Sequence, residues 1–484
     1  MGETKLNRWL YDHCPVFVQD LMASVYGRQK NRYRYGSPAY AQWEAFYRES
    51  ATWPNECLRE YQAEQVRHMV AYALEHVPFY RKWFGDCGLK AADVRGPEDL
   101  ALLPLLTKAE IRSAGTDLLS DAFDPAELQS HAASGSTGTP ITLYDDRLAT
   151  IRNYAIHWAQ CRPGLTRHDR FANFTGLELV NPARRKPPFW RMNYPMHQRL
   201  YSIFHLSDTN MPHYLDDLEK FRPTWMYGYP SALSTLADFA LRSGYEYPHE
   251  IKAVITSSEQ CLPEYRRNIE KAFRARVWDE YGQNEMVGLA FECECGRMHV
   301  KEEYSLMEFV PTGERAEGCD VYELVCTSFV NHGWPLIRYR VGDLALVKPG
   351  ASCPRGRPGR VVEAIYGRTA QCLIAADGSR ITNISVIATR CRNLKALQAV
   401  QERRGQVRLR VVPFPEYDRA SDEARLLAEC RKRLGDESRM HIDVEYVDHI
   451  ELTERGKFLM IVSKLPKEQA CARDSSARPA DERA

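Results

Sequence analysis

Glycine and hydroxyl residues are concentrated in the run Ser134–Pro140, whose types and spacing could bind an anion. The run holds two glycines and four hydroxyl side chains in seven positions. Gly135 and Gly138 permit backbone conformations that other residues avoid, so several N–H groups and hydroxyls can turn toward one phosphate. No Gly-Lys-Ser/Thr follows at the required spacing, which excludes a Walker A loop. Turns of this composition are common without a ligand, so phosphate binding and a plain turn both remain open.

Further groups of polar and aromatic residues follow in a fixed order. They are Trp225–Ser231, Thr256–Glu259, Tyr281–Glu285 and Tyr339–Asp343, then Tyr366–Arg368 and Thr453–Phe458. Each group alone is more often a turn with solvated side chains, so the groups are informative as an ordered set.

The elements that must position these residues are predicted from apolar spacing. Up to about residue 100 the spacing is helical, as in Gln62–Leu74, and Pro78 breaks that helix. From about residue 103 to 345 short apolar runs alternate with amphipathic segments, which predicts α/β layers. Strands are expected at Gln129–Ala133, Ile141–Tyr144, Ala253–Thr256 and Val277–Tyr281, and helices at Pro263–Phe273 and from Ser231. The glycine-rich run is then the tip of a hairpin.

The composition changes after the loop Pro349–Gly359, which is dense in glycine and proline. Beyond it the pattern predicts a small α+β unit, with strands at Gln406–Val412 and Ile442–Val447. A helix is expected at Ser421–Leu434, with Ser421 as its N-cap. The expected organisation is a helical extension at 1–100, a large α/β core at 101–367, a small α+β domain at 368–467 and a disordered tail at 468–484.

The composition favours a globular protein without a strongly charged partner. Hydrophobic residues make up 44% and charged residues 27% of the 484 residues, with a formal net charge of +1. That balance gives no reason to expect nucleic acid or an anionic membrane as partner. The first residues lack the apolar core of a signal peptide. Fourteen scattered cysteines are then expected to be reduced thiols, which indicates a cytoplasmic protein.

The order and spacing of the motifs resemble the adenylate-forming superfamily of acyl-CoA synthetases and adenylation domains. Within it they are most similar to the phenylacetate–CoA ligase branch and its CapK-like members, over roughly residues 60 to 465. The resemblance implies a large mixed α/β domain followed by a small α+β lid. It also implies activation of a carboxylic acid with ATP and Mg²⁺ to an acyl-adenylate, and then acyl transfer, with coenzyme A as the first choice of acceptor.

The resemblance also assigns the nucleotide to particular residues. The β- and γ-phosphates of ATP would be held by Ser134, Gly135, Ser136, Thr137, Gly138 and Thr139. Ser258 and Glu259 would line the adenine pocket, and Tyr281, followed by Gly282, would stack on adenine. Asp343 would accept hydrogen bonds from the ribose hydroxyls, supported by Arg368.

Three further residues would act on the reacting groups. Glu285 would coordinate Mg²⁺ between the phosphates, since this ion needs few protein carboxylates. Lys457 would bridge the attacking carboxylate and the α-phosphate, where a cation stabilises the transition state. His205, in the segment Phe171–Tyr229 that would form the acyl pocket, would lie near the substrate carboxylate, although a histidine among apolar residues is also a common core residue.

Two positions depart from the family pattern. Gly367 and Arg368 are followed by Thr369, Ala370 and Gln371, without the usual acidic hinge residue. Either Gln371 serves as the pivot, or the enzyme favours adenylation over a standard thioester step. Gln283 and Asn284 replace the commoner threonine before Glu285, and Asn284 can still donate to a phosphate or to the substrate carboxylate.

A zinc site is a further expectation. Cys293, Cys295 and His299 lie within seven residues of one another, and Cys353 lies in the later glycine- and proline-rich loop. Together they could form a tetrahedral, structural Cys₃His site. The alternative is a hairpin with free thiols and an exposed histidine.

Two alternatives for the function stay open. The acceptor after coenzyme A would be an amine or hydroxyl on a sugar or amino acid. A non-catalytic nucleotide- or acyl-binding scaffold is the rival from another class, disfavoured because Asp343, Arg368 and Lys457 are all present. The oligomeric state is expected to be a monomer or a homodimer.

Overall fold

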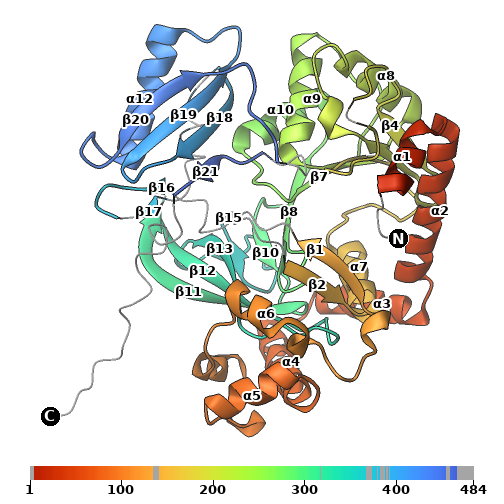
Figure 1. Ribbon diagram of the computed structural model, residues 1–484, viewed down its shortest axis with the longest axis vertical. Coiled ribbons are helices and arrows are strands. Elements are labelled where there is room, and N and C mark those ends of the chain that lie inside the picture. Colours follow the sequence, from red (N-terminus) through yellow and green to blue (C-terminus); the bar gives the residue numbers. More distant parts are fainter. Residues whose placement is uncertain are drawn as a thin grey trace. The chain divides into compact units, whose positions relative to one another are not determined.

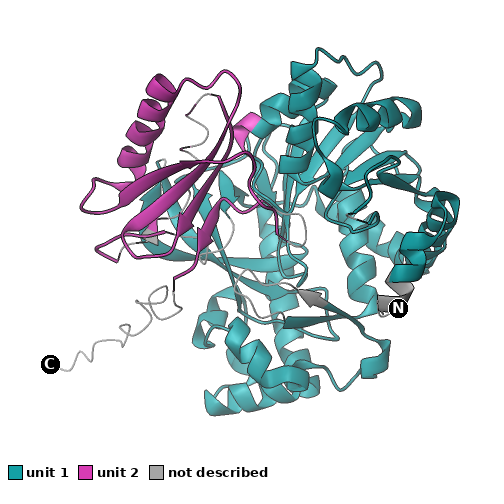
Figure 2. Ribbon diagram, turned by 45° about the horizontal axis from the view of Figure 1, so that its top comes forward, with its two compact units in different colours: residues 1–261, 265–366 teal, residues 262–264, 367–484 magenta. Residues whose placement is uncertain are grey.

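The protein is described by a computed structural model over residues 5–133, 141–181, 183–316, 318–366, 373–378, 380–381, 387, 391, 393–453 and 458–465. The chain forms two compact units (Figure 2). One comprises Met1–Cys261 and Tyr265–Tyr366, and the other comprises Leu262–Glu264 and Gly367–Ala484.

The first unit begins with five α-helices (Figure 1). They are α1 (Lys5–His13), α2 (Val16–Tyr35), α3 (Pro38–Ser50), α4 (Asn55–His76) and α5 (Pro78–Asp86). The helix predicted around Gln62–Leu74 is therefore confirmed as part of α4. Pro78 ends α4 and also begins α5, because proline disfavours helix at the preceding residue but fits the first turn of a new helix.

A nine-stranded sheet forms the centre of the first unit, in the order β14-β10-β9-β8-β7-β6-β3-β5-β4. Its strands are β3 (Phe171–Phe174), β4 (Trp190–Asn193), β5 (Gln198–Tyr201), β6 (Trp225–Gly228), β7 (Ala253–Ser257), β8 (Val277–Gly282), β9 (Leu289–Glu292), β10 (Met298–Val300) and β14 (Val361–Val362). Strands β5, β3, β6, β7 and β8 run parallel, so their carboxyl ends share one edge. All residues of β7 are buried, as expected for a central parallel strand.

Helices cover both faces of this sheet, as alternating side chains require. Met226 and Val254 pack with α8 (Met211–Phe221), α9 (Pro230–Arg242) and α10 (Pro263–Phe273). Their neighbours Trp225 and Ile255 pack with α3 and α7 (Arg147–Gln160) on the opposite face. The sequence prediction of α/β layers is confirmed here.

A second sheet packs against α4, α5 and α6 (Lys108–Ala114). It contains β11 (Ser305–Ala316), β12 (Cys319–Ser328), β13 (Tyr339–Val347) and β15 (Ala364–Tyr366), in that order. The hairpin of β1 (Gln129–Ala133) and β2 (Ile141–Asp145) contributes Ile141 and Leu143 to the same core. Short 3₁₀ helices complete the unit: η1 (Ala91–Asp93), η2 (Pro97–Leu102), η3 (Gly115–Leu118), η4 (Pro125–Glu127), η5 (Tyr194–Met196) and η6 (Ile203–His205).

The second unit is a small α+β structure. Its sheet has the order β20-β19-β18-β21, formed by β18 (Leu394–Gln401), β19 (Gln406–Pro413), β20 (His441–Tyr446) and β21 (Ile461–Ser463). Helix α12 (Arg419–Leu434) packs on it, and β16 (Leu373–Ile374) pairs with β17 (Arg380–Ile381).

The N-cap prediction for the helix of the second unit was wrong. The cap is Asp418, whose carboxylate accepts a hydrogen bond of 2.7 Å from the Ser421 N–H. Ser421 therefore lies inside the first turn of α12. Its own N–H, which has no acceptor within the helix, is satisfied by the Asp418 carboxylate. Among the described residues, no helix is both long and apolar enough to cross a membrane.

Candidate active site

The two strands predicted around the glycine-rich run are confirmed. β1 and β2 pair antiparallel, and Ala133 lies directly opposite Ile141. The run between them therefore starts and ends at neighbouring points of one hairpin. The proposed phosphate-binding residues Ser134–Thr139 themselves lie outside the described residues, as do Arg368 and Lys457.

A bulge in β13 positions Asp343. Leu344 pairs with Glu323 and Arg340 pairs with Val325, so three residues of β13 lie opposite one residue of β12. Within this bulge Gly342 has φ of 82°, a left-handed conformation that glycine adopts without steric penalty. Bulges redirect side chains out of the regular ladder, and here the bulge carries the carboxylate of the Tyr339–Asp343 motif.

Tyr281, on β8 of the nine-stranded sheet, contacts Asp343, on β13 of the four-stranded sheet. The Tyr281 hydroxyl donates a hydrogen bond of 2.7 Å to Asp343 Oδ2. Gln283 Nε2 donates to the same oxygen at 3.3 Å and also to the Tyr281 hydroxyl. Burial, and after it the Asp343 charge, raises the pKa of Tyr281 well above its ordinary value, so the phenol stays a proton donor. The structure thus joins the residues proposed for adenine and for ribose.

Glu285 is buried, and its charge acts on the carboxyl group of Asp145. It is 8% exposed, and the hydroxyl of Tyr339, on β13, lies 3.5 Å from its Oε1. Asp145, at the end of β2, is also buried, and its Oδ1 has no hydrogen-bond partner among the described residues. Burial, then the charges of Asp146 and Glu285, raises the pKa of Asp145 to about 7. The end of the β1–β2 hairpin therefore carries a carboxyl group on which the charge of Glu285 acts.

Sequence reasoning missed Asp145 and Asp146. Asp146 caps α7 by accepting from Ala149 N at 2.7 Å, and its second oxygen accepts from His332 N at 2.8 Å and Gly333 N at 3.1 Å. It therefore ties the end of the hairpin to the segment after β12. The signal was present as two successive acids directly after the strand that leaves the glycine-rich run.

Ser258 and Glu259 follow β7 at the carboxyl edge of the parallel strands. Ser258 is exposed and has φ of 72°, which is uncommon for a residue with a side chain. Glu259 accepts from Ser231 Oγ at 2.6 Å and from Ser231 N at 3.3 Å, so it binds the amino end of α9. Gly282 and Asn284 are exposed just beyond Tyr281 on the same edge. Ligands of open α/β sheets bind at this edge.

Close backbone packing explains the glycine of the Trp225–Ser231 motif. A Cβ on Gly228 would lie 2.7 Å from the Phe174 carbonyl oxygen of the neighbouring strand β3. Glycine therefore allows β6 to approach β3 just before α9 begins.

His205 has the contacts of a core histidine. Its Nδ1 lies 2.8 Å from Ser202 Oγ, and its Nε2 lies 3.2 Å from the Asn181 carbonyl oxygen. The ring stacks on Phe189 with a centroid distance of 4.9 Å. Burial lowers the pKa of His205, so it is neutral at pH 7. Both ring nitrogens are already engaged, which leaves little capacity for a reacting proton.

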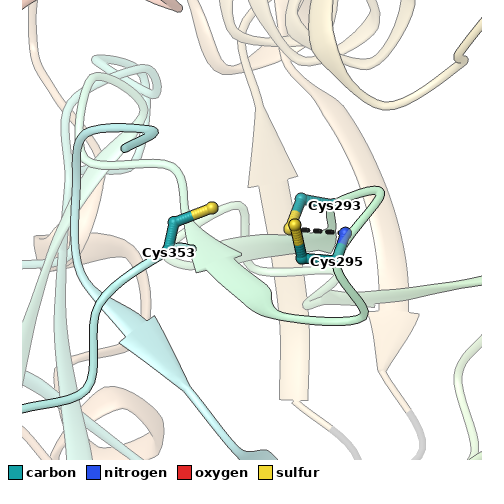
Figure 3. A group of neighbouring side chains, drawn as sticks. All are labelled: Cys293, Cys295 and Cys353. Carbon is teal, nitrogen blue, oxygen red and sulfur yellow. Dashed lines mark hydrogen bonds between the residues drawn. The ribbon is translucent and has the colours of Figure 1, made fainter. Parts of the chain in front are cut away.

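Three of the four predicted zinc ligands come together (Figure 3). The sulfur atoms of Cys293, Cys295 and Cys353 all lie within 4.8 Å of one another. Burial alone would raise the pKa of Cys353, but hydrogen bonds from the backbone of Arg355 and Arg357 and from the other two thiols lower it. Cys353 is therefore more readily ionised than Cys293, whose pKa is raised mainly by burial.

His299 is not a member of this three-sulfur group. Its Nδ1 lies 3.3 Å from the Pro358 carbonyl oxygen, and its buried Nε2 has no hydrogen-bond partner among the described residues. Burial and the charge of Lys301 lower its pKa to about 4, so the ring is neutral and could serve as a ligand.

A buried ion pair supports β8 beneath Tyr281. Arg162 Nη1 donates to Glu280 Oε2 at 2.6 Å, and His157 Nε2 lies 3.6 Å from Glu280 Oε1. Burial raises the pKa of Glu280, but Arg162 and then His157 outweigh it and bring this pKa down to about 2. Glu280 is therefore ionised and holds the strand that carries the site.

Two family models match the chain. The AMP-binding enzyme family matches residues 133–313, which begin at the hairpin and include Tyr281 and Glu285. The CapK C-terminal domain matches residues 373–464, which lie in the second unit.

Two curated proteins and one solved structure are similar to this chain. Protein CapK of Staphylococcus aureus is 24% identical over 456 residues, covering 93% of this chain and 97% of CapK. A phenylacetate-coenzyme A ligase of Thermus thermophilus is 28% identical over 342 residues, covering 67% and 74%. A 2-hydroxyisobutyryl-CoA ligase, solved in the postadenylation state, matches the fold with a TM-score of 0.66 and 19% identity, covering 86% and 91%.

Proposed function

We propose that this chain, an adenylate-forming ligase with an AMP-binding enzyme domain and a CapK C-terminal domain, activates a carboxylic acid with ATP and transfers the acyl group to coenzyme A. The observation that carries the proposal is the hydrogen bond between Tyr281 and Asp343, together with the charge of Glu285, which acts on Tyr281 and on Asp145 of the β1–β2 hairpin. An aromatic ring, a buried carboxylate acceptor and a second carboxylate match the base, ribose and phosphates of one nucleotide.

In the first step a carboxylate oxygen of the acid attacks the α-phosphorus of ATP. A new P–O bond forms, the bond from the α-phosphorus to the bridging oxygen breaks, and pyrophosphate leaves. Asp343 would accept hydrogen bonds from the ribose hydroxyls. The loop Ser134–Thr139 would hold the leaving phosphates with its amides and hydroxyls, assisted by Asn284.

Glu285 fits a role as ligand of Mg²⁺. Its oxygens are hard donors, and the nearby Asp145 has a buried oxygen without a partner among the described residues. When bound, this ion would neutralise phosphate charge.

Lys457 is proposed to neutralise charge on the carboxylate and the α-phosphate during this attack. Its placement on a separate lid domain, 368–467, is supported by the compact second unit and by the CapK C-terminal match at 373–464. We leave His205 out of the catalytic groups, because Ser202 and Asn181 engage its two ring nitrogens.

In the second step a nucleophile attacks the acyl carbonyl carbon and loses its proton. The bond from that carbon to the phosphate oxygen breaks, and AMP leaves with the oxygen and the bonding electron pair. Coenzyme A is the proposed nucleophile, since the Thermus relative is named as a coenzyme A ligase. The free thiols of the described cysteines support a reducing compartment, and we therefore propose that the enzyme acts in the cytoplasm.

Zinc is proposed as a structural ion at Cys293, Cys295 and Cys353. Three sulfur donors within 4.8 Å of one another suit Zn²⁺, and the lowered pKa of Cys353 favours the thiolate that binds it. The buried, unpartnered Nε2 of His299 remains the candidate for a fourth ligand. The ion would tie the β9–β10 hairpin to the loop that contains Cys353.

The test is exchange of labelled pyrophosphate into ATP across a panel of carboxylic acids. Acid-dependent exchange supports adenylation. Release of AMP and formation of a thioester only when coenzyme A is present support the proposed acceptor. Absence of exchange with every acid, in a preparation that retains its fold, would favour the non-catalytic scaffold.

A further inference from the structure

Helices α1 and α2 expose an unusual amount of apolar surface. Among the described residues, seven of the twelve large exposed hydrophobic side chains lie on these two helices. They are Trp9, Leu10, Phe17, Leu21, Met22, Val25 and Tyr26. Phe17 is 72% exposed and Leu21 is 61% exposed, values far above those of core residues. On α2, Phe17, Leu21 and Val25 recur every four residues and therefore lie along one side of the helix. An exposed apolar stripe of this kind marks an interaction surface.

The inner face of α2 is polar, which is the reverse of an ordinary surface helix. The helix covers β4, the edge strand of the nine-stranded sheet (Figure 1). Asp20 Oδ1 accepts from Met192 N at 2.9 Å, Ser24 Oγ accepts from Tyr194 N at 3.2 Å, and Asn31 Nδ2 donates to the Pro195 carbonyl oxygen at 3.2 Å. The first contact satisfies an N–H of the edge strand β4, and the other two hold α2 against the 3₁₀ helix η5 that follows this strand. They also force the apolar side of α2 outward.

Rotating α2 so that its apolar side faced β4 would produce a steric clash. A Cβ on Gly27 would lie 2.0 Å from Asn193 Oδ1. Side chains as large as those of Phe17 or Leu21 therefore cannot pack where Gly27 meets β4. The outward orientation of the apolar residues is fixed by close packing on the other side.

The acidic side chains of α1 and α2 point toward the protein, and the exposed charged side chains of α2 are basic. The acidic residues Asp12 and Asp20 both turn inward, where Asp12 accepts from Asn181 Nδ2 at 3.1 Å and Asp20 accepts from Met192 N. The exposed charged residues of α2 are Arg28 and Arg32, one and two turns beyond the apolar positions on the same face. Lys30 lies 4.5 Å from the ring centroid of Tyr26 at the border of that face. The outward surface is therefore apolar and cationic, without an exposed acid on α2.

We propose that the outer face of α1 and α2 docks on the surface of an anionic phospholipid bilayer. Apolar and aromatic side chains can enter the boundary between head groups and acyl chains, while arginines remain at the phosphates. Charge complementarity favours this partner over a second copy of the chain, whose matching face would bring arginines of the same sign. The contact lies on the surface of the bilayer and needs no spanning helix. The net charge of +1 gave no reason to expect an anionic membrane, because it averages over the whole chain and does not report how charges are arranged on α2. It is independent of the proposed reaction.

Sedimentation of the full chain with vesicles tests this proposal. Wild type is expected to bind vesicles of phosphatidylcholine and phosphatidylglycerol at low salt, and to bind phosphatidylcholine alone about tenfold less. Phe17→Gln with Leu21→Gln should lower binding about tenfold or more, because the apolar contact is lost. Arg28→Glu with Arg32→Glu should lower binding to anionic vesicles by a similar factor and remove its salt dependence.

Matched controls distinguish binding through this surface from non-specific binding of the protein to vesicles. Leu102→Gln replaces an apolar side chain that is 55% exposed elsewhere in the first unit, and Arg59→Glu reverses an exposed charge on α4. Both should bind vesicles as wild type does, and all variants should keep the wild-type circular dichroism and thermal midpoint. Equal binding by wild type and Phe17→Gln/Leu21→Gln would overturn the proposal. So would a dimer in light scattering that this double variant dissociates, because the occupant would then be a second copy.

Discussion

Tyr281 and Asp343 are joined by a hydrogen bond of 2.7 Å, although they lie in different sheets and in motifs far apart in the sequence. The contact fixes the position of the Asp343 carboxylate, and the bulge at Gly342 allows the strand to present it. This contact brings two sequence motifs, each weak alone, together in one candidate site.

Replacing Asp343 tests the ribose contact. Asp343→Ala should lower kcat/KM for ATP in pyrophosphate exchange by about 10- to 100-fold, since hydrogen bonds to a charged acceptor contribute about 1.5–3 kcal/mol. Tyr281→Phe should have a smaller effect, because Gln283 still donates to Asp343. Asp320→Asn, on an exposed ion pair with Arg315, is the control and should behave as wild type. Unchanged kinetics in Asp343→Ala would remove this residue from the site.

Lys457 is expected to act in adenylation. Lys457→Ala should lower the exchange rate by about a hundredfold or more, since a lost transition-state contact has an effect of this size. Lys464→Ala removes a lysine of the same unit that pairs with Glu402 on the surface, and it should leave the rate unchanged. Equal rates for the two variants would contradict the assigned role.

Glu285 should set the magnesium requirement. Glu285→Gln is expected to raise the Mg²⁺ concentration for half-maximal exchange by about tenfold, because a charged ligand becomes neutral. Asp145→Asn should shift it in the same direction by less, since the charges of Asp145 and Glu285 interact. Glu44→Gln, on α3 in an exposed pair with Arg48, is the matched control. A magnesium dependence unaltered by Glu285→Gln would exclude it as a ligand.

The buried Glu280–Arg162 pair predicts a pH-dependent stability. The pKa of Glu280 is lowered from 4.5 to about 2, so the native state stabilises the ionised form. That contribution is present above pH 4.5 and is lost as the pH falls through about 2. At pH 7 Glu280→Gln should lower the free energy of unfolding by about 3 kcal/mol.

Thermal midpoints across a pH series measure this effect. The difference between wild type and Glu280→Gln should shrink between pH 4.5 and 2. The control Asp238→Asn breaks the Arg242 pair, which lies within one helix near the surface, and should change stability by less than about 1 kcal/mol. A difference that stays constant with pH would show that Glu280 is not the titrating group.

The three-sulfur group predicts bound zinc. Purified without chelators, the protein should carry about one zinc ion per chain by elemental analysis. Cys353→Ser should lose that zinc and unfold at a lower temperature. Cys57→Ser, an exposed cysteine on α4, should retain it. Zinc at background level in wild type would leave the group as three free thiols.

The sequence by itself determined the elements and the order of the motifs. The hairpin flanking Ser134–Pro140, the buried strand β7 and the helix α10 all follow from patterns among near neighbours in the chain. Local periodicity and turn composition carry that information. The resemblance to the adenylate-forming superfamily is carried instead by the order of the quoted motifs along the chain.

The tertiary structure alone decided which distant residues meet. The bulge in β13 joins Asp343 to Tyr281, the hairpin places Asp145 where the charge of Glu285 acts on it, and the loop with Cys353 reaches the β9–β10 thiols. His205 is engaged by Ser202 and Asn181, which its apolar neighbours in the sequence did not reveal. Such contacts depend on strand order, register and backbone bulges, which are set by packing between segments that are distant in the chain. The spacing of residues within one segment does not determine which other segment it pairs with.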